Sequence, residues 1–286
     1  MIVRNYKDGT PLDVANLNKI TVIFDRGESE HTEIGHNEWR PHLDGPPHFH
    51  DEKEQVFYVT SGVGVVKLGN EQREVKPGCL VYIPAGLQHQ TITTSEEPLC
   101  YLLCNIYESN EDKTFAQHIE SVRSVRKAQA ENQDSGGGSA IAQIKNPPKF
   151  FEDINQGKVY EFGSNQTILL IDRSESERIE LVVVVWPARN KGAMVAHSEK
   201  EQTFFVLEGH GEVTIDGETR PIAPGDVVFV PRNTPHTTES FDEDLRYLCL
   251  NTLIGERKYS SFDEMFNAIA PARRERWESG SKEVGE

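Results

Sequence analysis

The feature that most constrains the fold of this chain is an internal repeat with a fixed offset of 147 positions. Motifs in the first half recur in the second half without a gap. A long repeat of this kind indicates one structural unit that is present twice, so the 286 residues predict two domains of similar fold. The matched positions are Asp25-Arg26 and Asp172-Arg173, Trp39 and Trp186, Gly45 and Gly192, His50 and His197, Glu52 to Gln55 and Glu199 to Gln202, Gly62 and Gly209, Pro84 and Pro231, and His89 and His236.

Each copy reads as a series of short strands separated by Gly, Pro, Asn and Asp. Gly69-Asn70 and Asp216-Gly217 lie at corresponding positions between alternating runs, where tight hairpin turns are expected. Many short strands at this spacing predict an all-β sandwich or barrel. The expected strands cover residues 22–24, 55–60, 64–68, 79–83 and 100–105 in the first copy, and 168–171, 179–185, 203–207, 212–215, 227–230 and 247–251 in the second.

A segment with the composition of a helix follows each copy. After the first copy this segment covers residues 113–132, and a Gly/Ser-rich segment comes next. We interpret the Gly/Ser-rich segment as a linker, with a lid over a neighbouring site as the alternative. Ser260-Ser261 followed by acids predicts a helix start near the C-terminus, and residues 278–286 are expected to fray. We therefore expect domains at 1–112 and 148–258, a helical and Gly/Ser-rich linker at 113–147, and a C-terminal helix and tail at 259–286.

Composition and charge narrow the function classes. The formal net charge of −16 argues against nucleic acid or an anionic membrane as a partner. No apolar run approaches a membrane span, and the first residues lack the apolar segment of a signal peptide, so a cytoplasmic location is expected. The four cysteines lie in apolar runs, which predicts reduced core residues rather than disulfides.

The chemistry is concentrated around His48 and His50. Residues two apart in a strand face the same side, so these two imidazoles are presented to one point. After a polar turn, Glu54 or Gln55 can bring an oxygen donor to that point, and His89, behind a Pro-x-Gly turn, can supply a third nitrogen. Three histidine nitrogens and one oxygen suit Fe, Mn, Co, Ni or Zn as metal ligands.

These residues resemble the two motifs of the cupin superfamily, G-x5-H-x-H-x3,4-E-x6-G and G-x5-P-x-G-x2-H-x3-N. There are departures: only two residues separate Gly45 from His48, and Thr93 replaces the closing asparagine. The family glutamate, counted back from Gly62, is Gln55 here, whereas Glu54 keeps the shorter spacing to the histidines.

The resemblance implies a bicupin, with two tandem double-stranded β-helix (jelly-roll) barrels and short flanking helices. It implies one divalent transition metal per chain, held in the first barrel by His48, His50, Gln55 and His89, with Glu54 as the substitute for Gln55. A small-molecule substrate is expected, and a homodimer is compatible with the family.

The second copy has lost one ligand. Val195 stands at the position of His48, which leaves His197, Gln202 and His236. Two imidazoles and a neutral amide make a weak metal site, so we interpret this set as vestigial, in a barrel kept for packing. The remaining histidines could still bind a polar ligand.

Several functions remain open. Three imidazoles and an amide leave the full charge on a divalent ion, which favours Lewis-acid chemistry on a chelating, enolisable keto acid or sugar-like substrate. Such a ligand set resembles that of the bicupin isomerase of bacilysin biosynthesis. The alternatives are a dioxygenase similar to bicupin quercetinases and a non-catalytic cupin that binds a small molecule. Glu54 is the candidate acid or base, with Tyr58 and Tyr82 behind it, although strand alternation would turn Glu54 away from the site.

Overall fold

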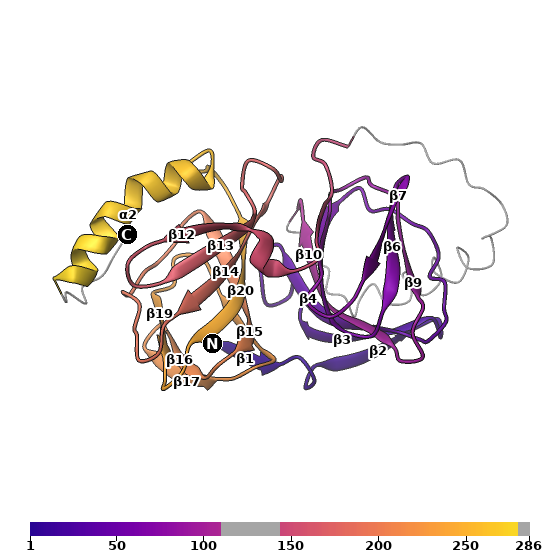
Figure 1. Cartoon of the computed structure of the whole chain (residues 1–286), viewed down its shortest axis with the longest axis horizontal. Coiled ribbons are helices and arrows are strands. Elements are labelled where there is room, and N and C mark those ends of the chain that lie inside the picture. Colours follow the sequence, from indigo (N-terminus) through magenta and orange to yellow (C-terminus); the bar gives the residue numbers. More distant parts are fainter. Residues whose placement is uncertain (110–143, 280–286) are drawn as a thin grey trace. The chain divides into compact units, whose positions relative to one another are not determined.

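The structure is a computed structural model that describes residues 1–109 and 144–279 (Figure 1). The expected helix at 113–132, most of the Gly/Ser-rich linker and the last residues of the tail lie outside this range. The chain forms two compact units, one made of residues 6–154 and the other of residues 1–5 and 155–286. We call them the N-terminal and the C-terminal barrel.

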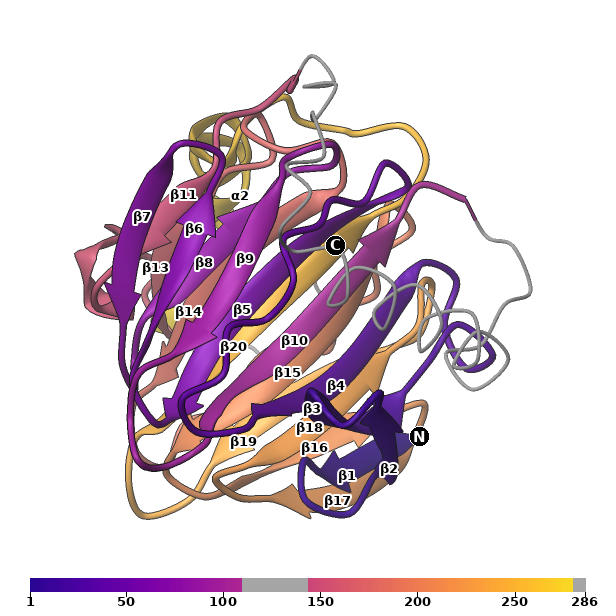
Figure 2. The same ribbon diagram turned by 90° about the vertical axis from the view of Figure 1, so that its right-hand side faces the viewer.

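The N-terminal barrel is made of two sheets, which Figure 2 shows with β7, β6 and β9 side by side. The larger sheet has the order β11-β8-β5-β10-β4-β3-β2, and the smaller has the order β7-β6-β9. All its pairings are antiparallel, as in a jelly roll. The strands are β2 (Thr10–Val14), β3 (Asn18–Phe24), β4 (Thr32–Trp39), β5 (Lys53–Ser61), β6 (Gly64–Leu68), β7 (Glu71–Val75), β8 (Leu80–Ile83), β9 (His89–Thr93), β10 (Leu99–Tyr107) and β11 (Lys149–Phe151).

The two sheets of this barrel bury a shared apolar core. Alternation along β5 turns Phe57 and Val59 inward, and the Phe57 ring stacks on Tyr101 with centroids 4.4 Å apart. The Tyr101 hydroxyl accepts hydrogen bonds from Asn37 and Trp39, at 2.8 Å each, so these three buried side chains satisfy one another inside the barrel.

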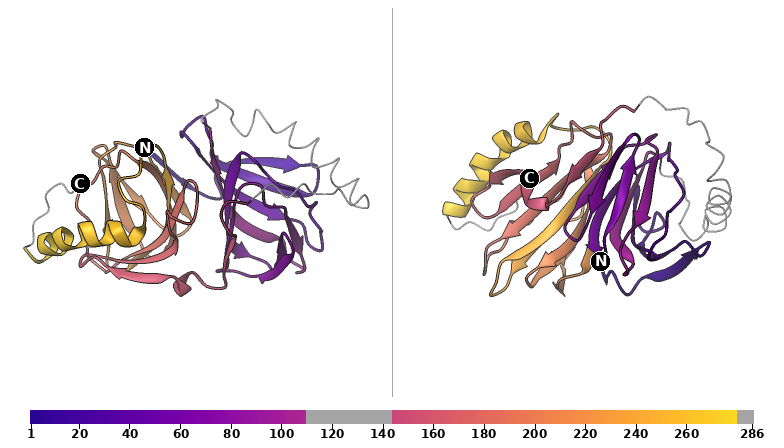
Figure 3. Two further views of the ribbon diagram at one scale, coloured as in Figure 1. Left: turned by 90° about the horizontal axis from the view of Figure 1, so that it is seen from above. Right: turned by 45° about the vertical axis from the view of Figure 1, so that its right-hand side comes forward.

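The C-terminal barrel repeats this plan. Its sheets have the orders β1-β18-β15-β20-β14-β13-β12 and β17-β16-β19. The helix α2 begins behind the N-cap Ser261, whose hydroxyl accepts from Glu264 N, as the sequence predicts. Figure 3 shows α2 beside the strands of this barrel. Its elements are β1 (Ile2–Asn5), β12 (Lys158–Glu161), β13 (Gln166–Ile171), β14 (Ile179–Trp186), β15 (Lys200–Glu208), β16 (Gly211–Ile215), β17 (Glu218–Ile222), β18 (Asp226–Val230), β19 (His236–Ser240), β20 (Leu245–Leu253) and α2 (Phe262–Glu278), with the short 3-10 turn η1 (Ile154–Gln156) between the units.

One outer strand of each large sheet comes from the other half of the sequence. Residues 1–5, expected in the first domain, form β1 and pair with β18 of the C-terminal barrel. Residues 149–151, expected in the second domain, form β11 and pair with β8 of the N-terminal barrel. The sheet to which an edge strand pairs depends on the unpaired backbone N–H and C=O groups at that sheet's edge. The sequence of the edge strand alone does not show where those groups are.

The two expected hairpins are present. Gly69-Asn70 connects β6 to β7, and Asp216-Gly217 connects β16 to β17. Strand β4 is not among the strands expected from the sequence, because its inward positions carry polar residues such as Glu33 and Asn37. No helix within the described residues is long and apolar enough to cross a membrane.

Candidate metal centre

A backbone ladder brings the His48 and His89 segments together. His48 N donates to His89 O at 3.0 Å, and His89 N donates to His48 O at 2.8 Å. Gly86 N donates to His50 O at 2.8 Å, and Gly86 has a φ of +80°, a conformation that favours glycine. The Pro84-x-Gly86 turn therefore sets the register that places His89 beside the two earlier histidines.

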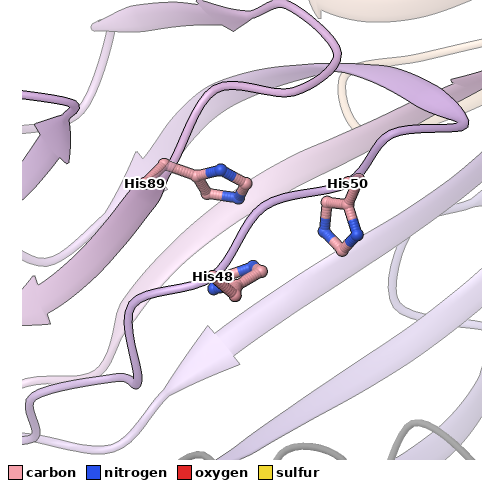
Figure 4. A group of neighbouring side chains, drawn as sticks. All are labelled: His48, His50 and His89. Carbon is pink, nitrogen blue, oxygen red and sulfur yellow. The ribbon is translucent and has the colours of Figure 1, made fainter. Parts of the chain in front are cut away.

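The three imidazoles converge on one point at the end of the N-terminal barrel (Figure 4). One nitrogen from each of His48, His50 and His89 lies within 4.8 Å of the others. The ring centroids of His48 and His89 are 4.2 Å apart, and His50 lies 5.0 and 5.5 Å from them. His48 and His89 are buried, and His50 is half-buried. This group could hold a metal ion.

Hydrogen bonds fix which nitrogen faces that point. The Nδ1 atom of His48 lies 2.9 Å from Pro46 O, and that of His89 lies 3.0 Å from Leu87 O. A carbonyl can only accept, so Nδ1 carries the proton in both rings and Nε2 keeps its lone pair. Donation from the far nitrogen to a carbonyl is the usual support of a metal-binding histidine.

Gln55 shares the inward face of β5 with Phe57, whose ring centroid is 6.3 Å from that of His89. Gln55 Nε2 donates to Asn105 Oδ1 at 2.7 Å, and Asn105 Nδ2 donates to Glu33 Oε1 at 2.8 Å. Because Glu33 accepts the Asn105 amide group, Asn105 offers only its oxygen to Gln55, and this sets the Gln55 amide orientation. Gln55 Oε1 is buried and has no hydrogen-bond partner among the described residues.

Comparison with known proteins agrees with this geometry. Residues 35–105 and 181–251 each match the family described as the cupin domain. The chain belongs to the cupin family. An uncharacterized protein of Aquifex aeolicus is 30% identical to this cupin over 89 residues, which are 31% of this chain and 72% of that protein. An uncharacterized protein of Methanocaldococcus jannaschii is 31% identical over 70 residues, which are 24% of this chain and little more than half, 56%, of that protein.

One sequence relative and one group of similar solved structures carry named activities. Quercetin 2,3-dioxygenase of Bacillus subtilis is 29% identical over 83 residues, which are 29% of this cupin and 25% of that enzyme. Solved structures of oxalate decarboxylase from Bacillus subtilis superpose with a TM-score of 0.61 at 19% identity, covering 90% of this chain and 78% of theirs. That enzyme is described as having Mn(II) centres. At this identity the structural match shows the fold, and it confirms two tandem jelly-roll barrels.

Glu54, the alternative ligand, lies on the opposite face of β5 from Gln55 and Phe57. It is 3% exposed, and its carboxylate accepts a hydrogen bond from the Tyr82 hydroxyl. Tyr58 shares this face of β5. The position of Glu54 therefore argues against a role as acid or base beside the three histidines.

The C-terminal barrel places the matched residues in the same way but with one donor fewer. Val195 takes the place of His48 in the ladder with His236, and the rings of His197 and His236 are 5.4 Å apart. Gln202 Nε2 donates to Asn251 Oδ1 at 2.7 Å, and Gln202 Oε1 is buried without a hydrogen-bond partner in the part of the chain that the structure describes. Within the described residues, the group of three metal-ligand side chains close enough to hold an ion is His48, His50 and His89 of the N-terminal barrel.

Asn105 and Glu33 were missed as supporting residues by the sequence reading. Burial raises the pKa of Glu33, and nearby Lys53 and the Asn105 amide lower it in part. The C-terminal barrel has the same series of hydrogen bonds, in which Asn251 Nδ2 donates to Glu180 Oε1 at 2.9 Å. Polar residues stand on inward faces of strands in both copies, Glu33 and Asn105 in the first and Glu180 and Asn251 in the second. This recurrence is the sequence signal that could have revealed Glu33 and Asn105.

The two candidate oxygen ligands can be separated by substitution. We expect Gln55→Ala to weaken metal retention about tenfold or more, because it removes the inward oxygen, and Glu54→Gln to leave it unchanged while keeping the bond to Tyr82. Gln202→Ala is the matched control in the other barrel and should also leave metal retention unchanged. Metal content after dialysis against a weak chelator is the measurement. Loss with Glu54→Gln and retention with Gln55→Ala would show that Glu54 is the ligand.

Proposed function

We propose that this cupin is a metal-dependent enzyme of the isomerase or lyase type. One divalent transition metal would be held by His48, His50, His89 and Gln55, and its substrate would be a small, chelating, oxygen-bearing molecule such as an enolisable keto acid or a sugar-like compound. The observation that carries this proposal is the donor set itself, with two Nε2 lone pairs fixed by carbonyl partners and a buried Gln55 Oε1 without a hydrogen bond.

The charge of the donor set decides the chemistry that we favour. Three neutral imidazoles and an amide cancel none of the charge of a divalent ion, whereas a glutamate would cancel half of it. When bound, such an ion would act as a Lewis acid on a substrate carbonyl or enolate. His48 and His89 are 8% and 3% exposed, so an anionic substrate oxygen would meet that charge with little screening by water.

The chain's own residues would hold the donor atoms in place for such a substrate. The carbonyls of Pro46 and Leu87 hold the two imidazoles, and the chain of Glu33 and Asn105 holds the Gln55 amide. The donor types suit Fe, Mn, Co, Ni or Zn. The Mn(II) centres of the structurally similar oxalate decarboxylase support manganese among these.

A dioxygenase is the second candidate. The match to quercetin 2,3-dioxygenase, at 29% identity over 83 residues, favours it. The predicted similarity of this ligand set to that of the isomerase of bacilysin biosynthesis supports the first candidate.

Oxygen consumption separates the two candidates. With a panel of keto acids, enols, sugars and oxalate, we expect turnover that survives exchange among Co, Zn and Mn and consumes no O2. Product formation followed by NMR, together with an oxygen electrode, makes the measurement, and the protein without added metal is the control. Stoichiometric O2 uptake that stops under nitrogen would establish the dioxygenase instead. A ligand that raises the melting temperature without any chemical change would identify a binding protein.

A further inference from the structure

The C-terminal barrel keeps the geometry of the metal centre although one imidazole is missing from it. Val195 N donates to His236 O at 2.9 Å, and His236 N donates to Val195 O at 2.8 Å, which repeats the ladder of the N-terminal barrel. The ring centroids of His197 and His236 are 5.4 Å apart, against 5.5 Å for the matched pair in the N-terminal barrel. The Phe204 ring lies 6.3 Å from that of His236, the same distance as for the matched pair. The side chains around this point are therefore held in place although Val195 supplies no donor.

Gln202 presents a fixed hydrogen-bond acceptor at this point. It lies two residues before Phe204 on β15, so both side chains are on the inward face of the strand. Gln202 Nε2 donates to Asn251 Oδ1 at 2.7 Å, and Asn251 Nδ2 donates to Glu180 Oε1 at 2.9 Å. Glu180 is held in turn by Arg173 Nε, 2.6 Å from its Oε2 atom. Because the amide nitrogen of Gln202 is committed to Asn251, its Oε1 atom is left as an acceptor, buried and without a hydrogen-bond partner among the described residues.

His236 presents a second fixed acceptor. Its Nδ1 atom lies 2.9 Å from Thr234 O, and a carbonyl can only accept, so Nδ1 carries the proton and Nε2 keeps its lone pair. Burial lowers the pKa of His236 to about 4 and also lowers the pKa of His197, so both rings are neutral near pH 7. The His197 ring makes no hydrogen bond with residues 1–109 or 144–279, so its tautomer can adapt to a ligand.

Two fixed acceptors select a ligand that donates hydrogen bonds. A carboxylate or phosphate would bring negative charge against the lone pairs of Gln202 Oε1 and His236 Nε2, so these atoms disfavour an anion. An ammonium group would donate, but burying its charge costs far more than burying a neutral hydroxyl. The half-buried Val195 and the buried Phe204 supply apolar surface for a carbon skeleton.

We propose that the C-terminal barrel binds a neutral molecule with two adjacent hydroxyl groups, one donating to Gln202 Oε1 and the other to His236 Nε2, with His197 as an adaptable third partner. A buried acceptor without a hydrogen bond costs free energy, and the first hydroxyl would offset that cost at Gln202. This role needs no metal, and it does not depend on the reaction proposed for the N-terminal barrel.

Titration calorimetry on the full chain tests this proposal, with cis-1,2-cyclohexanediol as the probe. Cyclohexanol lacks one hydroxyl, and cis-2-aminocyclohexanol carries an ammonium group in its place. The background is a His50→Ala chain, which lacks one donor of the metal centre, so that a diol cannot bind through a metal in the N-terminal barrel. We expect one diol site per chain, and both analogues should bind about tenfold or more weakly than the diol. Failure of the metal proposal would leave this result unchanged.

Substitutions locate the site. Gln202→Met and His236→Phe each remove one acceptor and keep a side chain of similar size, and each should weaken diol binding about tenfold or more. Val195→His keeps both acceptors but fills the space beside them, so it should also weaken binding in buffer freed of metal. His210→Ala is the control, because this exposed ring pairs with Glu243 at 2.6 Å, and it should leave binding unchanged. Circular dichroism shows whether each variant keeps its fold. The proposal is overturned by no binding of the diol, by equal binding of cyclohexanol, by tighter binding of the amino analogue, or by unchanged binding in Gln202→Met and Val195→His.

Discussion

His50→Ala is expected to remove the metal from this cupin almost completely. The protein purified without chelator should carry about one metal per chain, and the variant should retain less than about a tenth of that amount. The reason is the geometry of the cluster, in which each of the three imidazoles supplies one nitrogen within 4.8 Å of the others. Removal of one imidazole leaves a site of the kind seen in the C-terminal barrel, and His89→Ala should have the same effect. Elemental analysis by mass spectrometry gives the stoichiometry, and circular dichroism shows whether the fold is kept.

The repeat supplies matched controls for this experiment. His197→Ala and His236→Ala remove the corresponding imidazoles of the C-terminal barrel, where Val195 has already replaced one donor. Both variants should keep the full metal content. Two metals per chain in the parent protein, or loss of metal from His197→Ala, would contradict the assignment of a single centre to the N-terminal barrel.

Arg173→Met is expected to lower the free energy of unfolding of the C-terminal barrel by about 3–5 kcal/mol. Arg173 is 0% exposed and Glu180 is 1% exposed, and their ion pair measures 2.6 Å. The substitution leaves a buried carboxylate whose remaining hydrogen bond comes from the neutral Asn251 amide. Urea denaturation followed by circular dichroism measures the change.

Two further variants interpret that loss. Arg73→Ala breaks the exposed pair with Glu71 and should cost no more than about 1 kcal/mol. Arg173→Met combined with Glu180→Leu should recover part of the stability, because an apolar pair carries no desolvation penalty. A loss below about 1 kcal/mol for Arg173→Met, or a double variant much less stable than the single one, would show that the ion pair does not support this barrel.

Much of the fold followed from local patterns in the sequence. The repeat identified two units because it runs without a gap from Asp25 to His89, and the spacing of His48 and His50 placed two imidazoles on one side because side chains alternate in extended chain. Counting back from Gly62 favoured Gln55 over Glu54, and the structure turns Gln55 inward and Glu54 outward. These inferences needed only the period of a strand.

Other features depend on contacts between distant segments. The partners of β1 and β11 are decided by open sheet edges, and the sequence reading placed both strands with the wrong barrel. Asn105 and Glu33 support Gln55 from adjacent strands, and the register of those strands cannot be read from the sequence.

The position of the metal tests the central claim most directly. Crystals of the protein purified without chelator should give one anomalous-scattering peak per chain, about 2.0–2.3 Å from nitrogens of His48, His50 and His89, with Gln55 Oε1 as the fourth protein ligand. Data collected on both sides of the absorption edge identify the element. A peak between His197 and His236, a peak bound by Glu54, or no peak at the three histidines of the N-terminal barrel would contradict the account.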